Sequence, residues 1–395
     1  GRNQIEFKRF ILRTSFAGRN KTLFKDLLTA RLSDSLSFGV MLGKPVLLFI
    51  NGEYWGIHDL REYTDRHYLE YQFEVDPDHV DLLTGNAELN PLLNGGVVEG
   101  SNQGWHEVQE YIAEHTLSEP QNYEHISGLI EMNSLIDYYA SEVFFKNYDW
   151  PKNNCKYWRS ADPITPFQYI LHDLDAGWGF TASSYDMIEH VSIMEPNLVP
   201  NPPYANRLFN KLLENNQFMN SFLDRLACLM INEFSAQRLL LEIDQLRSEY
   251  EPGIDLHWER WYQNDPSAWN DSIQEVLIDF AESRHEHLID HVESHFGIDF
   301  DPEIRCLFAG QNSTLQVSNK ILVYPNPSST YTEIQGPNNG HHWDMIVQDQ
   351  LGRVQYQWSN DSVVRIDTSD WPNGVYFVSA KSMNHAYNAM LVVQH

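Results

Sequence analysis

Residues 147–159 read Asn-Tyr-Asp-Trp-Pro-Lys-Asn-Asn-Cys-Lys-Tyr-Trp-Arg. Within it, Asp149 stands five residues before Asn154. The preceding segment, 133–147, has apolar residues at helical spacing, which places Asp149 just beyond the end of a predicted helix. A plainer interpretation stays open, because an Asp-Trp-Pro triplet can simply terminate a helix and this Asp–Asn spacing often occurs by chance.

A predicted β-hairpin follows this loop. Its strands are Cys155–Arg159 and Phe167–His172, and the residues between them are rich in turn formers. The second strand leads directly into Asp173-Leu-Asp175. Alternate side chains of an extended segment share one face, so we expect both carboxylates to reach the same cluster.

The order of these residues matches that of a phosphoryl-transfer site. Protein kinases have a catalytic Asp that accepts the hydroxyl proton, a metal-binding Asn five residues later, and a metal-binding Asp after a hairpin. This chemistry needs a carboxylate to orient the hydroxyl and hard oxygen ligands to hold Mg²⁺ against the phosphates. We assign Asp149 as the candidate catalytic base and Asn154 and Asp173 as candidate metal ligands. Asp175 is a further metal ligand or a replacement for Asp173.

The chain begins with predicted strands around one helix. Ile5–Arg13 alternates like a strand, and Thr22–Phe38 carries apolar residues at helical spacing. Pro45–Ile50 and Tyr54–Leu60 flank an Asn-Gly pair, which is a strong indicator of a hairpin turn.

The later part of the first 300 residues is predicted to be mostly helical. Apolar spacing near three and four residues marks its helices, at 207–213, 218–231, 236–250 and 273–296. A strand-rich beginning followed by helices is typical of an α+β domain, which we place over residues 1–300.

The segment Asn51–Asp65 reads Asn-Gly-Glu-Tyr-Trp-Gly-Ile-His-Asp-Leu-Arg-Glu-Tyr-Thr-Asp. It resembles the Gly-x-Tyr-x-Gly-x-Tyr-x-Leu-x-Glu pattern of the CotH-type (spore-coat) atypical protein kinases, with His58 where that family usually has Tyr. The stretches 149–154 and 172–179 resemble later blocks of the same family, and the resemblance covers residues 1–297 in the expected order. It implies an atypical protein-kinase fold that transfers phosphate from ATP to Ser or Thr residues of an extracytoplasmic protein.

The resemblance also implies roles for individual residues. It carries the catalytic role over to Asp149 and the metal-binding role over to Asp173. It also makes Glu62 a candidate partner of the nucleotide-binding lysine. No glycine-rich loop precedes the first strand, from which Lys8 and Arg13 could contact phosphate. We therefore expect ATP and Mg²⁺ as cofactors, Arg13 and Glu62 as cofactor-binding residues, and a chain that begins inside a domain. One alternative is that Lys8, Arg13 and Glu62 are solvated surface residues. Another is that the protein binds nucleotide differently or not at all.

Residues 320–395 are short alternating runs separated by Asn, Gly and Pro, which predicts a small all-β sandwich. Val323–Pro327, Asp349–Arg353 and Ile366–Phe377 resemble three blocks of the type IX secretion C-terminal sorting domain of Bacteroidota-type bacteria. The resemblance implies export through the periplasm, type IX secretion machinery as a partner, and a secreted or outer-membrane surface-attached protein. Residues 301–319 show little periodicity and are predicted to be a linker.

Composition excludes several other functions. The 395 residues include 27 Lys and Arg against 55 Asp and Glu, a net charge of −28, so nucleic acid is not an expected partner. The longest apolar run, Pro45–Ile50, is far shorter than the roughly 20 residues of a membrane span. The three cysteines, Cys155, Cys228 and Cys306, are odd in number and widely spaced, and they suggest neither a metal site nor a disulfide framework.

Two functions therefore follow from the sequence. The first is a secreted or surface kinase, dependent on ATP and Mg²⁺, that acts on Ser or Thr of a protein substrate. The second is a catalytically silent surface scaffold or glycan-binding adhesin, for which Trp258 and Trp261 would form a stacking platform if exposed. We favour core positions for this pair. We also favour a solvent face, rather than a metal site, for His287, His291 and His295.

Overall fold

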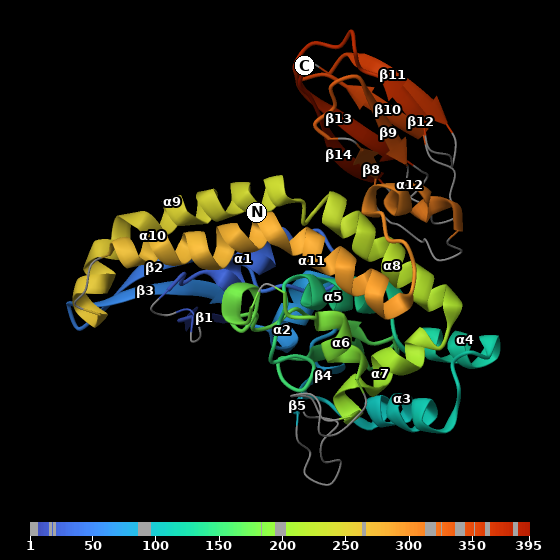
Figure 1. Ribbon diagram of the computed structural model, residues 1–395, viewed down its shortest axis with the longest axis horizontal. Coiled ribbons are helices and arrows are strands. Elements are labelled where there is room, and N and C mark those ends of the chain that lie inside the picture. The colour runs from blue at the N-terminus through green and yellow to red at the C-terminus, as the bar shows by residue number, and fades with distance from the viewer. Residues whose placement is uncertain are drawn as a thin grey trace. The chain divides into compact units, whose positions relative to one another are not determined.

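The computed structural model of the chain (Figure 1) divides into two compact units, Gly1–Gln311 and Asn312–His395. The first unit mixes helices with sheets and the second is built from strands, so the predicted α+β class with an all-β C-terminal region is confirmed. None of the helices in the described residues combines the length and apolar character needed to cross a membrane. The structure describes residues 7–15, 18, 21–85, 96–182, 184–193, 203–262, 266–312, 321–324, 326–335, 344–350, 352–359, 364–381 and 386–395.

A three-stranded antiparallel sheet begins the first unit. It consists of β1 (Phe10–Arg13), β2 (Gly43–Ile50) and β3 (Glu53–Glu62) in the order β1-β3-β2. Asn51 and Gly52 connect β2 to β3 with φ angles of 53° and 86°, which is the left-handed conformation that an Asn-Gly turn provides. The predicted hairpin is therefore confirmed.

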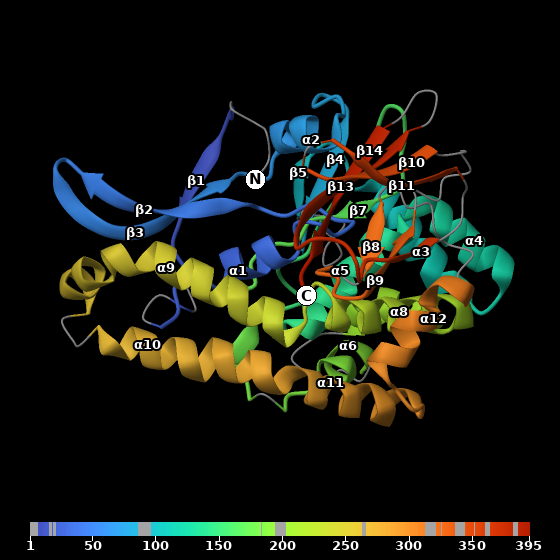
Figure 2. The ribbon, with the colours of Figure 1, turned by 90° about the horizontal axis from the view of Figure 1, so that it is seen from above.

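The long helix α9 (Ala236–Trp261) packs on this sheet, and α1 (Lys25–Leu32) packs against α9 (Figure 2). The close approach of α9 depends on Gly56 of β3. A Cβ atom at Gly56 would lie 2.7 Å from Nε1 of Trp261, and its φ of +117° is one that L side chains rarely adopt. A glycine at this position lets the helix cross directly over the strand.

A second sheet has the order β5-β4-β6-β7. The pair β6 (Lys156–Ser160) and β7 (Gln168–Tyr169) confirms the hairpin predicted from Cys155–Arg159 and Phe167–His172, although its second strand is only two residues long. β4 (Val80–Thr84) and β5 (Val97–Glu99) complete the sheet. Residues 86–95, which connect β4 to β5 in the chain, lie outside the described residues.

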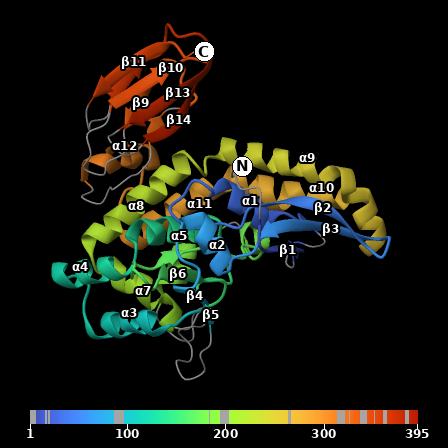
Figure 3. The same cartoon turned by 180° about the vertical axis from the view of Figure 1, so that it is seen from behind.

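Helices make up most of the remaining first unit (Figure 3). Each predicted helix is present. Helix α9 extends eleven residues past its predicted end, and the helix predicted at 273–296 begins with a π-helical turn. Asp65 caps α2, because its carboxylate accepts hydrogen bonds from the backbone of His67 and Tyr68. The further helical elements are α2 (Arg66–Phe73), α3 (Gln103–Glu114), α4 (Pro120–Leu129), α5 (Met132–Phe144), η2 (Trp178–Phe180), α6 (Met187–Ser192), α7 (Pro203–Leu213), α8 (Asn216–Ile231), α10 (Ser267–Ile273), η3 (Gln274–Ile278), α11 (Asp279–Phe296) and α12 (Pro302–Asn312).

The two tryptophans considered as a stacking platform are in different environments. Trp258 is 1% exposed and belongs to the hydrophobic core, whereas Trp261 is 43% exposed. The core interpretation is therefore correct for Trp258 and wrong for Trp261. On α11, His287 and His291 stack with ring centroids 6.5 Å apart, and no metal-holding group of His, Cys, Asp or Glu occurs among the described residues.

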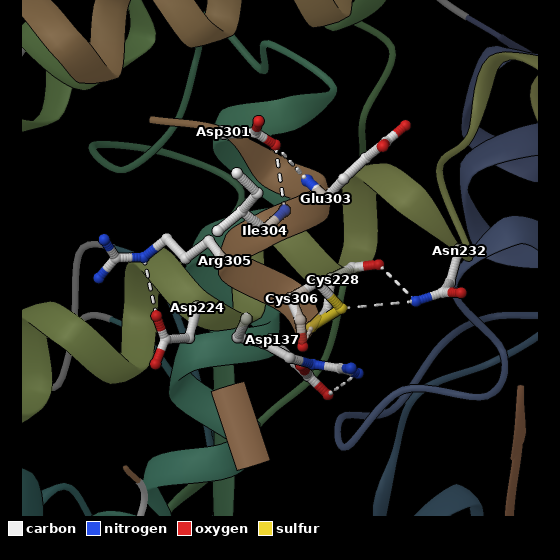
Figure 4. Close-up of a disulfide and its surroundings, with 10 residues drawn as sticks. Asp137, Asp224, Cys228, Asn232, Asp301, Glu303, Ile304, Arg305 and Cys306 are labelled. Carbon is white, nitrogen blue, oxygen red and sulfur yellow. Dashed lines mark hydrogen bonds and ion pairs between the residues drawn. A yellow bond between two sulfur atoms is a disulfide. The ribbon is translucent and has the colours of Figure 1, made fainter. Parts of the chain in front are cut away.

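Two predictions about the end of the first unit are wrong. Cys228 of α8 and Cys306 of α12 form a disulfide (Figure 4). They are 78 residues apart in sequence, so only the folded helix pair brings them together. The residues predicted to begin a linker instead form α12, which is held by this disulfide and by an ion pair of 2.7 Å between Arg305 and Asp224. Residues 313–319 of the predicted linker lie outside the described residues.

The second unit contains two antiparallel sheets with a hydrophobic core of their own. Part of its predicted opening motif, Pro325, lies outside the described residues. One sheet has the order β12-β9-β8, from β8 (Leu322–Tyr324), β9 (Tyr331–Gln335) and β12 (Val364–Asp367). The other has the order β11-β10-β13-β14, from β10 (Asp344–Gln348), β11 (Val354–Ser359), β13 (Gly374–Lys381) and β14 (Ala386–Val393).

Candidate functional site

Three distant segments meet at Asp173. The guanidinium of Arg13, at the end of β1, donates a hydrogen bond of 2.5 Å to one carboxylate oxygen of Asp173. The amide of Asn154 donates a hydrogen bond of 3.0 Å to the backbone carbonyl of Asp173. Asn154 and Asp173 have φ angles of 60° and 58°, which few residues other than glycine adopt and which cluster at functional sites. Three of the residues predicted for the site are therefore in direct contact.

Arg13 is paired with three carboxylates. In addition to Asp173, its guanidinium lies 3.6 Å from Asp26 and 3.6 Å from Asp175. Burial disfavours the charged form of Arg13, but these carboxylates outweigh that effect and hold its pKa above the ordinary value. The strand residue is thus a permanent cation at the centre of the cluster, not a solvated side chain.

Asp26, in the first turn of α1, connects this cluster to the sheet. Its carboxylate accepts hydrogen bonds of 2.9 Å from Arg61 on β3 and of 2.9 Å from the backbone N–H of Leu174. Burial favours the neutral form of Asp26, but Arg61 and Arg13 outweigh it and hold its pKa below the ordinary value. The Arg13–Asp26 pair thus joins a strand to the helix that follows it in the chain.

Glu62 has a different environment. It stands at the end of β3, and alternation along the strand directs it to the face opposite that of its neighbour Arg61. Its carboxylate accepts a hydrogen bond of 2.9 Å from the backbone N–H of Leu42. The carboxylate that pairs with Arg13 from a helix is that of Asp26, which the sequence reasoning missed. The role proposed for Glu62 stays a prediction.

Asp175 is held by protein groups on both sides. It is 5% exposed, and its carboxylate accepts a hydrogen bond of 3.0 Å from the hydroxyl of Ser15. The ammonium of Lys25, next to Asp26 on α1, donates to the backbone carbonyls of Asp175 and Gly177. Burial lowers the pKa of Lys25 to about 8. Helix α1 thereby fixes the segment that follows Asp173 through two adjacent charged residues.

Asp149 is half-buried in the loop after α5. The backbone N–H of the preceding Tyr148 donates a hydrogen bond of 3.2 Å to the carbonyl of Ala176. Asn147 donates from its amide to Glu142, over 2.9 Å, and to the backbone carbonyl of Asp173, over 3.4 Å. These bonds place the loop of the candidate base beside the segment that carries Asp173.

The oxygen atoms near Asp173 suit a Mg²⁺ ion that is also bound by phosphate. No group of three His, Cys, Asp or Glu side chains that could hold a metal forms among the described residues. Mg²⁺ typically takes one or two protein carboxylates and completes its shell with water and substrate phosphates. The side chain of Asp173 is 34% exposed, and the amide of Asn154 bonds through its nitrogen, which leaves its oxygen as a ligand. Asp175 is more enclosed and already engaged by Ser15 and Arg13.

Three titratable groups near the cluster are buried, so water is largely excluded around them. Burial lowers the pKa of His172 to about 3, and burial lowers the pKa of Lys156 to about 8. Burial likewise raises the pKa of Glu142 well above its ordinary value. Charges in such surroundings interact more strongly than they do in water, which favours stabilisation of a charged transition state.

Two protein-family models match the chain. A family model described as CotH kinase protein matches residues 2–288. The chain belongs to the CotH kinase family. A second model, described as a secretion system C-terminal sorting domain, matches residues 322–394. The sorting domain marks this CotH family member for export to the cell surface or the medium. A search of curated proteins found no match to the chain.

Proposed function

We propose that this CotH family member is a Ser/Thr protein kinase that uses ATP and Mg²⁺ and acts on a secreted or surface protein. One observation carries the proposal: Arg13 and Asn154 come from separate segments, and each donates a hydrogen bond to Asp173. Family membership and the sorting domain support the class of enzyme and the place where it acts.

In this proposal each residue has a distinct task. Asp149 orients the acceptor hydroxyl and takes its proton, as the catalytic-loop Asp does in protein kinases. Arg13 contacts the phosphates of the nucleotide, and Asp26 holds Arg13 in position from α1. Lys25 fixes the backbone after Asp173 through its bonds to two carbonyls.

Asp173 and Asn154 are the residues that would hold Mg²⁺, and Asp175 would support them from the enclosed side. A bound Mg²⁺ neutralises phosphate charge and orients the transferred group. The protein contributes the fixed placement of these oxygen atoms, since both residues are held in left-handed backbone conformations.

The test is transfer of labelled phosphate from ATP to a general acceptor such as casein, with the full chain and Mg²⁺. Asp149→Asn and Asp173→Asn should each lower the transfer rate by about 10²-fold or more, because each removes a group that acts in the transition state. Asp76→Asn, an exposed acid outside the site, is the matched control and should keep the parent rate. If the two site variants transfer phosphate as fast as the parent, the assignment is wrong.

A second candidate function is a CotH scaffold that does not transfer phosphate. The ion pair of 2.5 Å between Arg13 and Asp173 favours it, because Arg13 occupies a carboxylate oxygen that the metal would also need. Calorimetric titration with Mg²⁺ and ATP separates the two functions. Binding that Asp173→Asn removes supports the kinase, and the absence of binding to the parent supports the scaffold.

A further inference from the structure

A cavity of about 370 Å³ lies between the first sheet and helix α9. Its size falls within the range of roughly 300–1,000 Å³ that is typical of small-molecule sites. The walls come from residues 13–15 at the end of β1, from Leu23, from β3 between Trp55 and Asp59, and from residues 250–262 of α9 and its C-cap. The cavity shares Arg13 and Ser15 with the Asp173 cluster, but its other walls are separate from it.

His257 provides a hydrogen-bond donor in the wall of this cavity. Its Nδ1 accepts a hydrogen bond of 2.9 Å from the backbone N–H of Ile57, which leaves the proton of the neutral ring on Nε2. Burial lowers the pKa of His257 to about 4, so the ring is neutral at physiological pH. Nε2 is buried without a hydrogen-bond partner among the described residues, and His257 is 6% exposed. A buried donor without a partner is costly, and a ligand oxygen would satisfy it.

Asp59 provides an acceptor in the same wall. One of its carboxylate oxygens accepts a hydrogen bond from the hydroxyl of Tyr250 on α9. Burial raises the pKa of Asp59 to about 6, although Arg61 and Tyr250 oppose the shift. The group is 6% exposed and lines the cavity, so it offers a desolvated acceptor to a ligand hydroxyl.

Aromatic rings make up much of the remaining wall. Trp55 and Trp261 meet edge to face with centroids 5.4 Å apart, and Tyr262 lines the cavity beside them. The guanidinium of Arg260 lies over both indole rings, 5.0 and 5.3 Å from their centroids, which holds them in place. These rings offer flat apolar surfaces next to Asp59 and His257.

The charges in the wall disfavour an anionic ligand. Among the described lining residues Arg13 is the permanent cation, and three carboxylates already pair with it. Asp59 adds negative charge away from Arg13's proposed phosphate contact, so the part of the cavity that Asp59 lines repels an anionic group. A neutral ligand with one apolar face and several hydroxyl groups matches these walls.

We propose that this cavity binds a neutral hydroxylated ring, namely a sugar unit of an extracellular or cell-surface glycan. The apolar face of such a ring lies against the aromatic wall, while its hydroxyls donate to Asp59 and accept from Nε2 of His257. The sorting domain brings the chain to the compartment where such glycans occur. The cavity adjoins the proposed phosphoryl-transfer site through Arg13, but Asp149 and Asn154 are not part of its lining.

The test is saturation-transfer-difference NMR on the full chain with the methyl glycosides of glucose, galactose, mannose and N-acetylglucosamine. We expect transfer to the ring protons of at least one glycoside. Trp261→Ala should weaken its binding about tenfold, equal to about 1.4 kcal/mol. Phe49→Ala, another exposed aromatic residue of the same sheet assembly outside the cavity lining, is the matched control and should bind like the parent. Asp149→Asn should also bind like the parent.

Asp59→Asn provides a second variant in case Trp261→Ala fails to fold, as judged by circular dichroism and melting temperature. It keeps the shape of the side chain and should weaken binding of the same glycoside. The proposal is overturned if none of the four glycosides shows transfer, or if both cavity variants bind like the parent. ADP binding that Trp261→Ala removes, without glycoside binding, would instead assign the cavity to a nucleotide.

Discussion

Asp26 illustrates how one carboxylate connects a helix, two strands and the candidate metal segment. Burial favours its neutral form, but Arg61 and Arg13 hold its pKa below the ordinary value. Because the unfolded pKa of an aspartate is about 3.9, Asp26 stabilises the fold fully above about pH 4 and loses that effect as the pH falls below it. We expect Asp26→Asn to lower the free energy of unfolding at about pH 7 by about 3–5 kcal/mol, since it leaves buried arginines without their partner.

Urea unfolding at a series of pH values between about 3 and 7 measures both effects. The variant should show a shallower loss of stability below about pH 4 than the parent. Asp78→Asn removes an acid from an exposed ion pair with Arg66 and should leave stability unchanged. A variant of Asp26 that is as stable and as acid-sensitive as the parent would contradict the role of Asp26 as a connecting residue.

Gly56 gives a second prediction for a single residue. An added Cβ would meet Trp261 at 2.7 Å and His257 at 2.9 Å, on a backbone with φ of +117°. We expect Gly56→Ala to cost about 2–4 kcal/mol, because backbone strain and a clash with α9 act together. Gly52→Ala is the matched control, since Gly52 has a φ of +86° and nothing within 4 Å, so it should cost only about 1 kcal/mol of strain. Equal melting temperatures for the two variants would argue against tight packing of α9 on β3.

The candidate site was predictable only where its residues follow a fixed order along the chain. Asp149, Asn154 and Asp173 are recognisable because a loop and a hairpin separate them in the way that kinases do. Asp26 and Lys25 were missed because their contacts with Arg13 and Gly177 arise only on folding. In the structure they are adjacent charged residues of α1, a helix that is buried on nearly every side. A buried helix with charges must pair them, and that observation alone would have pointed to a polar cluster.

Among the elements, those with strong periodicity were predicted and those fixed by tertiary contacts were not. The hairpin of β2 and β3 follows from its Asn-Gly turn, and α8 follows from its apolar spacing. Helix α12 has a weak pattern of its own, and the disulfide to α8 and the Arg305 ion pair fix its position. No spacing rule connects two cysteines across 78 residues, so the sequence could not identify this pair.

The disulfide gives a prediction about α12. It joins residues 78 apart, and closing a loop of that size stabilises a fold by about 2–4 kcal/mol. We expect Cys306→Ser to lower the melting temperature of the first unit and to speed proteolytic cleavage within α12. Scanning calorimetry and timed limited proteolysis measure these effects, and a reductant should reproduce them in the parent.

Cys155→Ser is the control, because Cys155 lies in the same unit and is not part of a disulfide. It should melt and be cleaved like the parent under oxidising conditions. Export fits this arrangement, since disulfides form and persist outside the cytoplasm. If Cys306→Ser and the parent are cleaved at the same rate without reductant, the disulfide does not fasten α12 to α8.

For the whole molecule, the central question is whether the two units act separately. Each has its own hydrophobic core, and the core of the second unit is formed by residues beyond 320 alone. The candidate site and the α9 cavity are built from residues of the first unit. The proposed phosphate transfer and export should therefore be separable by truncation, because the described residues that form both sites lie in the first unit.

We expect the fragment 1–311 to fold, to keep the melting temperature of the first unit and to transfer phosphate at the rate of the full chain. Its export should be lost, because the sorting domain at 322–394 is absent. The measurement compares phosphate transfer by the two purified proteins, and their distribution between cells and medium in a bacterium with a type IX secretion system. A full-length chain with Asp173→Asn is the converse control, since it should be exported normally yet fail to transfer phosphate. A fragment that is exported like the full chain, or that folds but transfers phosphate far more slowly, would show that the second unit does more than direct export.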